Sequence, residues 1–157
     1  HRRKVTIFGS ARTKPHDPLY NHTENIAREL AQRGWMVVTG AGPGIMEAGM
    51  SGAGRSQSIG VSIRLPFESS ANPIIAGEDK FVSMRYFFTR KLMLVKESHA
   101  FICMPGGFGT LDEFFETLTL AQTKVINDFP IVVMGRQFYQ PFQQFFPKFP
   151  TLLIVLK

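Results

Sequence analysis

Short apolar runs alternate along this chain with longer stretches in which apolar residues recur at helical spacing. Since the runs are continuously apolar and helical stretches separate them, we expect a mainly parallel sheet that is covered on both faces. With right-handed crossovers, the expected fold class is α/β, a Rossmann-like, doubly wound sheet with helices on both faces. Strands are predicted at residues 4–8, 35–39, 58–63, 100–104 and 130–134, with a shorter one at 81–82. Helices are predicted at residues 20–33, 45–53, 84–96 and 110–123.

The predicted helices carry signals for their ends and for the faces that they bury. Asn21 or Thr23 is expected to cap the helix at 20–33, and Gly34 is expected to end it. In the helix at 84–96 an apolar stripe is expected to face the core, with Arg90 largely outside it. That stripe consists of Met84, Phe87, Phe88, Leu92 and Val95. The core face of the helix at 110–123 is predicted to consist of Leu111, Phe114, Phe115 and Leu118.

The length and composition are those of one globular domain. The chain has 157 residues, of which 44% are hydrophobic and 19% charged, and we expect a single domain over residues 1–157. Because the sequence begins at His1 rather than Met, its termini are expected to be incomplete. The Phe- and Pro-rich tail, residues 137–157, ends in the strand-like run TLLIVLK, which we expect to pack on the sheet or on a partner subunit.

The composition disfavours several classes of partner. No apolar stretch has the length of a membrane span. The formal charge of +6 comes from Lys and Arg residues that are scattered, apart from a basic cluster at residues 1–4. We therefore expect no membrane and no nucleic acid as partner, whereas a small phosphorylated ligand fits the same charge. Cys103 is the only cysteine, which excludes an intrachain disulfide and favours a cytoplasmic location.

The most informative motif is the glycine-rich turn at residues 105–113, PGGFGTLDE, which follows a predicted strand and opens a predicted helix. Glycines let the backbone approach a ligand closely, and the free N–H groups of a helix N-terminus favour an anion. Thr110 adds a hydroxyl donor. A tight strand-to-helix turn would explain the acidic residues alone, but it does not require three glycines among residues 106–109. The motif therefore predicts a phosphate site.

A carboxylate follows closely after this turn. Glu113 would lie near any phosphate bound there, and two anions repel each other. Arg90 and Lys91, in the preceding predicted helix, can offset that repulsion. Taken alone, these two cations would be solvated surface charges, but beside the glycine turn they are predicted to belong to a site.

Two other turns follow predicted strands. Residues 39–48, TGAGPGIMEA, resemble a dinucleotide-binding fingerprint, but Ile45 stands where the third glycine belongs, and no acidic residue ends the next strand. NAD is therefore weakly supported, and no cofactor is expected. The turn GSAR, residues 9–12, offers a backbone donor and a cation. The histidines form no cluster at ligand spacing and Cys103 is interpreted as a core residue, so no metal site is expected.

With these motifs the chain resembles the LOG (Lonely Guy) family. PGGFGTLDE matches the family pattern P-G-G-x-G-T-x-x-E at every fixed position, and Arg90-Lys91 stands where the family has its R-K pair. The segments GSAR, GAGPGIMEA and LPFE are also similar, so the resemblance runs from about Val5 to Gly135. It implies a phosphoribohydrolase that hydrolyses a purine nucleoside 5′-monophosphate, a cytokinin riboside form or AMP, to free base and ribose 5-phosphate. It further implies a homodimer or larger homo-oligomer.

The resemblance also implies roles for individual residues. Arg90 and Glu113 would be the catalytic pair, because a carboxylate near the anomeric carbon stabilises the positive charge that develops on the ribose. An arginine does not readily give up its proton, so Arg90 would orient Glu113 and the ribose. Met50 stands where a polar residue such as Asn would be expected, and the tail after Arg136 departs from the family pattern. The residues expected to bind substrate are Glu68, Lys91, Gly106, Gly107, Phe108, Gly109, Thr110, Gly9, Ser10, Gly42 and Gly44.

Two other functions are compatible with the same fold. A non-catalytic nucleotide-binding or sensing protein would use the same glycines, although Glu113 beside the phosphate favours an enzyme. A lysine decarboxylase, the label that family members often carry, would need a Schiff-base lysine and a partner for the pyridine nitrogen of its cofactor. Lys91 is the only placed candidate for that lysine.

Overall fold

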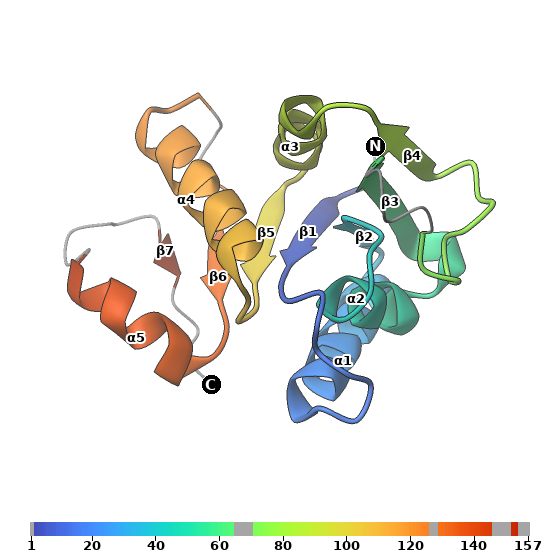
Figure 1. Cartoon of the computed structure of the whole chain (residues 1–157), viewed down its shortest axis with the longest axis horizontal. Coiled ribbons are helices and arrows are strands. Elements are labelled where there is room, and N and C mark those ends of the chain that lie inside the picture. Colours follow the sequence, from blue (N-terminus) through green and yellow to red (C-terminus); the bar gives the residue numbers. More distant parts are fainter. Residues whose placement is uncertain (1, 65–70, 126–128, 146–151, 154–157) are drawn as a thin grey trace.

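A single parallel sheet forms the centre of the molecule (Figure 1). The computed structural model describes residues 2–64, 71–125, 129–145 and 152–153. Within these residues the strand order is β4-β3-β2-β1-β5-β6-β7, and every pairing is parallel. The strands are β1 (Lys4–Phe8), β2 (Met36–Thr39), β3 (Ser58–Ile63), β4 (Phe81–Met84), β5 (Ala100–Cys103), β6 (Ile131–Val133) and β7 (Leu152–Leu153). The helices are α1 (Pro18–Gln32), α2 (Ile45–Ala53), α3 (Phe87–Lys96), α4 (Phe108–Gln122) and α5 (Arg136–Phe145), with a short 3-10 turn at Arg55–Gln57.

Helices cover both faces of the sheet, as the alternation of apolar runs and helical stretches predicts. On one face α1 and α2 pack on Val5 and Ile7 of β1. On the other face α3 and α4 pack on Phe8 of β1 and on Phe101 of β5. The predicted Rossmann-like, doubly wound α/β fold is therefore confirmed.

The strand order reverses between β1 and β5, and this reversal positions the site. From β1 the chain adds strands on one side through β4, and then returns to place β5 against β1 on the other side. Phe8 at the end of β1 lies opposite Cys103 at the end of β5, so the loops that follow both strands emerge side by side. In doubly wound sheets, ligands bind in the crevice at this reversal point.

The first helix begins earlier than the sequence predicts. Its cap is Asp17, whose Oδ1 accepts a hydrogen bond from the backbone N–H of Leu19 at 2.8 Å, and not Asn21 or Thr23. Thr23 instead lies one turn inside α1 and donates its hydroxyl to the carbonyl of Leu19. Pro18 at the first helical position explains the early start, because its fixed φ suits a helix N-terminus.

The predicted orientation of α3 is wrong for most of its stripe, although Val95 is buried as expected. Residues 81–84 form strand β4, and Met84 pairs with Ile63 of β3, so α3 begins only at Phe87. Leu94 and Val95 are its buried residues, whereas Phe87, Phe88 and Leu92 are 54%, 71% and 50% exposed. Apolar residues occur on more than one side of this helix, so periodicity alone could not decide which side faces the sheet.

The predicted core face of α4 is partly right. Phe114 and Leu118 are buried and Leu111 packs against them, but Phe115 is 37% exposed. The helix begins at Phe108, two residues before the predicted start, so no acidic residue lies in its first turn.

The described part of the tail packs on the sheet, one of the two outcomes that its composition suggested. Strand β7 pairs with β6 and forms the edge of the sheet, and Tyr139 of α5 is buried with its hydroxyl donating to the carbonyl of Met104 at 3.0 Å. Among the described residues, no helix combines the length and apolar character needed to cross a membrane.

Candidate functional site

Three loops are tied together at the carboxyl ends of β1, β2 and β5. The backbone N–H of Ser10 donates to the carbonyl of Pro105 at 3.2 Å, which joins the loop after β1 to the loop after β5. The carbonyl of Ser10 accepts from the N–H of Ile45 at 2.9 Å, which joins the same loop to the start of α2. Ser10 therefore fixes the relative positions of all three glycine-rich turns that the sequence singles out.

Some of the predicted glycines lie where these loops approach one another closely. Gly44 has φ +70°, and a Cβ there would collide with the carbonyl oxygen of Ser10. A Cβ on Gly106 would collide with the Thr110 hydroxyl, so its absence lets the turn close on the start of α4. Neither glycine is among the lining residues of the two cavities described below.

A first cavity, here called the α4 cavity, has a volume of about 670 Å³ and lies between the loop after β1 and the start of α4. Most of the predicted site residues line it, so the crevice at the strand reversal brings together segments far apart in the sequence. Its lining residues are Gly9, Ser10, Ala11, Arg12, Met46, Arg90, Gly107, Phe108, Gly109, Thr110 and Glu113.

The two predicted catalytic residues form an ion pair inside this cavity. Arg90 Nη1 lies 3.7 Å from Glu113 Oε1, and the two side chains are only 13% and 15% exposed. Burial raises the pKa of Glu113 to about 7, although the charges of Arg90 and Lys91 act to lower it. A carboxyl group with this pKa is partly ionised near neutral pH, which suits a group that accepts a proton or stabilises a developing positive charge.

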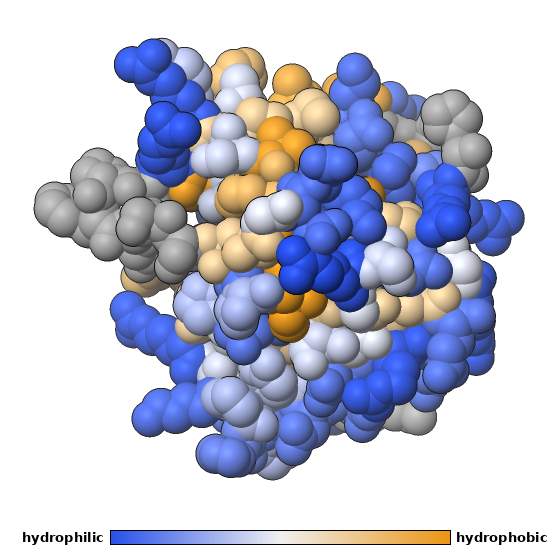
Figure 2. All heavy atoms as spheres, turned by 90° about the vertical axis from the view of Figure 1, so that its right-hand side faces the viewer, coloured by the Kyte–Doolittle hydropathy of each residue, from blue (hydrophilic) through white to orange (hydrophobic). Residues whose placement is uncertain are grey.

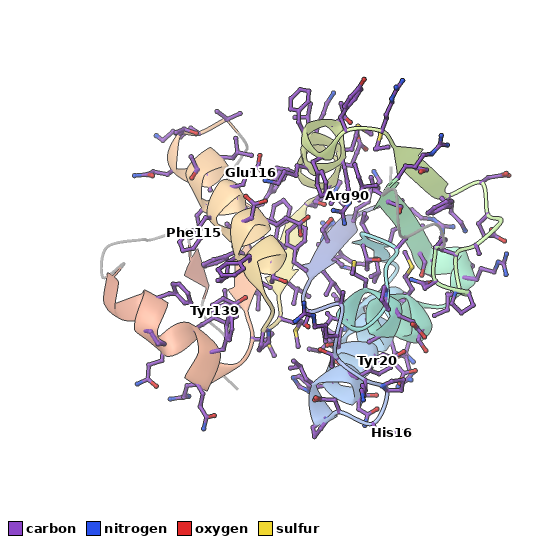
Figure 3. All side chains as sticks on the ribbon, in the orientation of Figure 1. His16, Tyr20, Arg90, Phe115, Glu116 and Tyr139 are labelled. Atoms are coloured by element: carbon purple, nitrogen blue, oxygen red, sulfur yellow. The ribbon has the colours of Figure 1, made fainter. Side chains whose placement is uncertain are left out.

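The guanidinium of Arg90 is held from several sides. Its Nε donates to the carbonyl of Val61 in β3 at 3.0 Å. A Cβ on Gly40, which follows β2, would collide with the guanidinium, so the glycine leaves room for it. Figure 3 shows Arg90 reaching from α3 toward the strands. These contacts explain why α3 turns its Arg90 side toward the sheet and leaves Phe88 exposed.

Lys91 lies beside this pair but contacts a different set of groups. Its Nζ is 2.6 Å from Asp112 Oδ2 and 3.1 Å from Glu116 Oε2, so it links α3 to α4 (Figure 3 labels Glu116). Burial on its own lowers the pKa of Lys91, but hydrogen bonds to both carboxylates outweigh it and raise the pKa. Lys91 is not among the lining residues of either cavity.

A second cavity, here called the β3 cavity, has a volume of about 550 Å³ and opens beside β3 and β4. Gly42, one of the predicted site residues, lines the β3 cavity but not the α4 cavity. The two cavities share Ala11, Met46 and Arg90. The other residues that line the β3 cavity are Gly40, Ala41, Pro43, Ser62, Ile63, Arg64, Ala71, Phe81, Ser83 and Phe87.

Asn72 shapes the turn that forms one wall of the β3 cavity. It is buried, its backbone N–H donates to the carbonyl of Ala41 at 2.9 Å, and its side-chain amide donates to the carbonyl of Gly42 at 3.1 Å. The same amide nitrogen lies 3.3 Å from the sulfur of Met50. Met50 is fully buried and lines neither cavity, so this departure from the family pattern lies behind the turn.

The sequence motifs did not identify every residue of the site. Gly40 and Met46 lie within the turn that was compared with a dinucleotide fingerprint, but neither was selected. Arg12 was noted only as a cation in a loop, yet it lines the α4 cavity with Thr110. Glu68 lies outside the described residues.

The described residues offer no group of three or more His, Cys, Asp or Glu side chains that could hold a metal ion. Cys103 is fully buried at the end of β5, and burial together with the nearby Glu113 carboxylate raises the pKa of its thiol above the usual range. This position agrees with its interpretation as a core residue.

Comparison with known proteins places these motifs in context. A family model described as "possible lysine decarboxylase" matches residues 43–151. The cytokinin riboside 5′-monophosphate phosphoribohydrolase LOG of Oryza sativa subsp. japonica is 34% identical over 127 residues, which is 76% of this chain and 50% of that protein. The probable cytokinin riboside 5′-monophosphate phosphoribohydrolase LOG6 of Arabidopsis thaliana is 34% identical over 115 residues, 71% of this chain and 55% of that protein. The chain thus spans about half the length of these curated relatives.

A solved structure supports the fold alone. The molybdenum cofactor carrier protein of Chlamydomonas reinhardtii superposes with a TM-score of 0.68 at 18% identity, covering 99% of this chain and 89% of the carrier. At this identity the match concerns the arrangement of strands and helices and not the site.

Proposed function

Because the chain belongs to the family described as possible lysine decarboxylase, the family of the LOG proteins, we propose that it is a phosphoribohydrolase. In this proposal it hydrolyses the N-glycosidic bond of a purine nucleoside 5′-monophosphate to free base and ribose 5-phosphate. The proposed substrates are AMP and cytokinin riboside monophosphates, the latter named by the activity of the curated relatives. The observation that carries the proposal is the partly buried Arg90–Glu113 pair, which shares a cavity with the N-terminus of α4.

The N-terminus of α4 is the proposed site of the 5′-phosphate. Residues 107–110 line the cavity there, and no described side chain caps the helix. Its free N–H groups and its dipole favour an anion, and the hydroxyl of Thr110 can donate a further hydrogen bond. Arg12 supplies a cation in the same cavity. Binding energy from the phosphate would orient the sugar and its reacting carbon.

Glu113 is the proposed group for the chemical step. As the bond from the ribose to the base breaks, the base leaves with the bonding electrons and positive charge develops on the ribose ring. The water that replaces the base gives its hydroxyl to the ribose carbon, and the proton it releases balances the charge of the leaving base. The ionised carboxylate of Glu113 stabilises the positive charge on the ribose, and it can orient or deprotonate the water that replaces the base. Arg90, held by Val61 and packed against Gly40, keeps the carboxylate in place.

The two alternative functions receive different support. A sensing protein on the same fold has no evident need for a carboxylate of raised pKa beside an anion site, and Glu113 therefore favours the enzyme. A decarboxylase would require a Schiff-base lysine that can lose its proton. Lys91, with its ammonium between Asp112 and Glu116 and its pKa raised, is poorly suited to that role.

We also propose that copies of the chain associate through the outer surface of α3 and the start of α4. Phe88 and Leu92 of α3 and Phe108 of α4 are 71%, 50% and 94% exposed. In Figure 2 hydrophobic side chains reach the surface toward the top of the molecule, the level at which α3 lies in Figure 1. Exposed apolar side chains favour association, and a homodimer or larger homo-oligomer would bury them. Light scattering on the purified protein would test this, and a monomer at micromolar concentration would contradict it.

The activity is tested by incubating the purified protein with AMP and, separately, with its N6-isopentenyl form, and by measuring free base by chromatography. Glu113→Gln and Arg90→Ala variants run beside it. Base release that both variants lose supports the hydrolase and the two roles. Nucleotide binding without base release from a panel of monophosphates would instead support the sensing protein.

A further inference from the structure

The catalytic pair lies where the two cavities meet. Arg90 lines both the α4 cavity and the β3 cavity, whereas Glu113 lines only the α4 cavity. Their side chains are 3.7 Å apart, so the carboxylate lies close to the boundary. A ligand bound across this boundary would present the bond between its two halves to Glu113.

The two cavities differ in chemistry. The α4 cavity contains the helix N-terminus, Arg12 and Thr110, which suit a sugar phosphate. Phe81, Phe87 and Met46 are among the apolar residues that line the β3 cavity. Hydroxyl and guanidinium donors stand among these apolar groups, and no Asp or Glu occurs among the described residues that line the cavity. The donors are Ser62, Ser83 and Arg64.

We propose that the β3 cavity is the subsite for the nucleobase, and that the ring of Phe87 stacks on a purine held there. A purine is flat and apolar on its faces and carries ring nitrogens that accept hydrogen bonds from hydroxyl and guanidinium donors. With the phosphate at the start of α4 and the base beside Phe87, the N-glycosidic bond crosses the boundary at Arg90. This inference rests on the proposed function. It adds a binding site for the nucleobase, the part of the substrate that the phosphate site does not hold.

Asn72 fixes one wall of the subsite before any ligand binds. Asn72 holds the carbonyls of Ala41 and Gly42 through two hydrogen bonds, and it is itself buried. Ala41 has φ +61°, a conformation that few residues other than glycine adopt, and the bond from Asn72 stabilises it. A preformed wall of this kind is typical of small-molecule sites.

Phe87 is the residue that tests the subsite with least damage to the fold. Phe81 packs against the cluster around Ile75, and a Cβ on Gly60 would lie only 3.1 Å from its ring, so replacing Phe81 would disturb the core. Phe87 is 54% exposed, and its neighbour Phe88 is 71% exposed but lines neither cavity. Phe88→Ala is therefore a matched control for Phe87→Ala.

The experiment compares the affinities for AMP and for ribose 5-phosphate, which lacks the base. Glu113→Gln serves as the common background so that no turnover disturbs the titrations, which are followed by calorimetry. Adding Phe87→Ala is expected to weaken AMP binding about 5- to 150-fold, the effect of losing one stacked base, and to leave ribose 5-phosphate binding unchanged. Adding Phe88→Ala is expected to change neither affinity. Light scattering on each variant checks that all are compared in the same state of assembly.

The outcomes separate this inference from the function on which it rests. If Phe87→Ala leaves AMP binding unchanged, or weakens both ligands equally, the subsite assignment is wrong while the phosphate site stands. If the background protein binds AMP no more tightly than ribose 5-phosphate, the base has no subsite at all. If it binds neither ligand, the proposed function fails as well.

Discussion

The pKa of Glu113 leads to a prediction about stability as well as catalysis. Burial raises this pKa from 4.5 to about 7, so between these pH values the unfolded chain gives up a proton that the folded protein keeps. By linkage, the free energy of unfolding falls as pH rises through this window. Each pH unit of the interval corresponds to about 1.4 kcal/mol. Because of this one group, the free energy of unfolding is therefore about 3 kcal/mol lower above pH 7 than at pH 4.5. The Glu113→Gln variant cannot ionise at this position, so its free energy of unfolding should not show this decrease.

Urea unfolding of the parent and of Glu113→Gln at several pH values between 4.5 and 8 measures this difference. As pH rises, we expect the free energy of unfolding of the variant to increase relative to that of the parent, by about 3 kcal/mol at pH 8. The variant should also lose its hydrolytic activity. Other titrating groups are common to both proteins and cancel in the difference. A difference that stays constant across this range would show that Glu113 has an ordinary pKa, and the electrostatic account of the site would then be wrong.

Three further substitutions test other parts of the site. Gly40→Ala should displace the Arg90 guanidinium and lower kcat/KM for AMP about 100-fold, and an unchanged value would mean that the position of Arg90 does not matter. Arg12→Ala should raise KM for AMP about 10- to 100-fold but leave binding of adenosine unaffected, so equal losses for the two ligands would contradict a phosphate contact. Lys91→Met should destabilise the protein by about 1 kcal/mol in urea unfolding, because its ion pairs to α4 are partly exposed. If it raised KM for AMP more than about tenfold instead, Lys91 would be a substrate contact, as the sequence motif suggested.

Much of the fold could be predicted because it rests on local patterns. The strands Lys4–Phe8 and Ser58–Ile63 and the helix Ile45–Ala53 begin and end where their apolar pattern and flanking glycines predict. The convergence of the glycine turns also follows from topology, since the carboxyl ends of parallel strands share one edge of the sheet. The meeting of Arg90 with Glu113 was therefore predictable from their places in the helix–strand–turn–helix unit.

The errors arose where tertiary contacts decide. The apolar residues of α3 occur on more than one side, and the contacts of Arg90 with Val61 and Glu113 determine which side is buried. Lys91 was expected to touch substrate because it matches the second residue of the family's R-K pair. Adjacent residues on a helix point in different directions, so in the structure its ammonium contacts Asp112, and its contact with substrate stays a prediction. Arg12 could not be selected from a short loop motif, because only the fold brings that loop to the start of α4.

The most direct test of the central claim is the identity of the products formed from AMP. Adenine and ribose 5-phosphate should be quantified in the same reaction, with Glu113→Gln as the inactive reference. The account predicts that the two products appear in equal amounts and that the variant forms neither. Adenosine and phosphate as products, or bound AMP that stays intact, would contradict it.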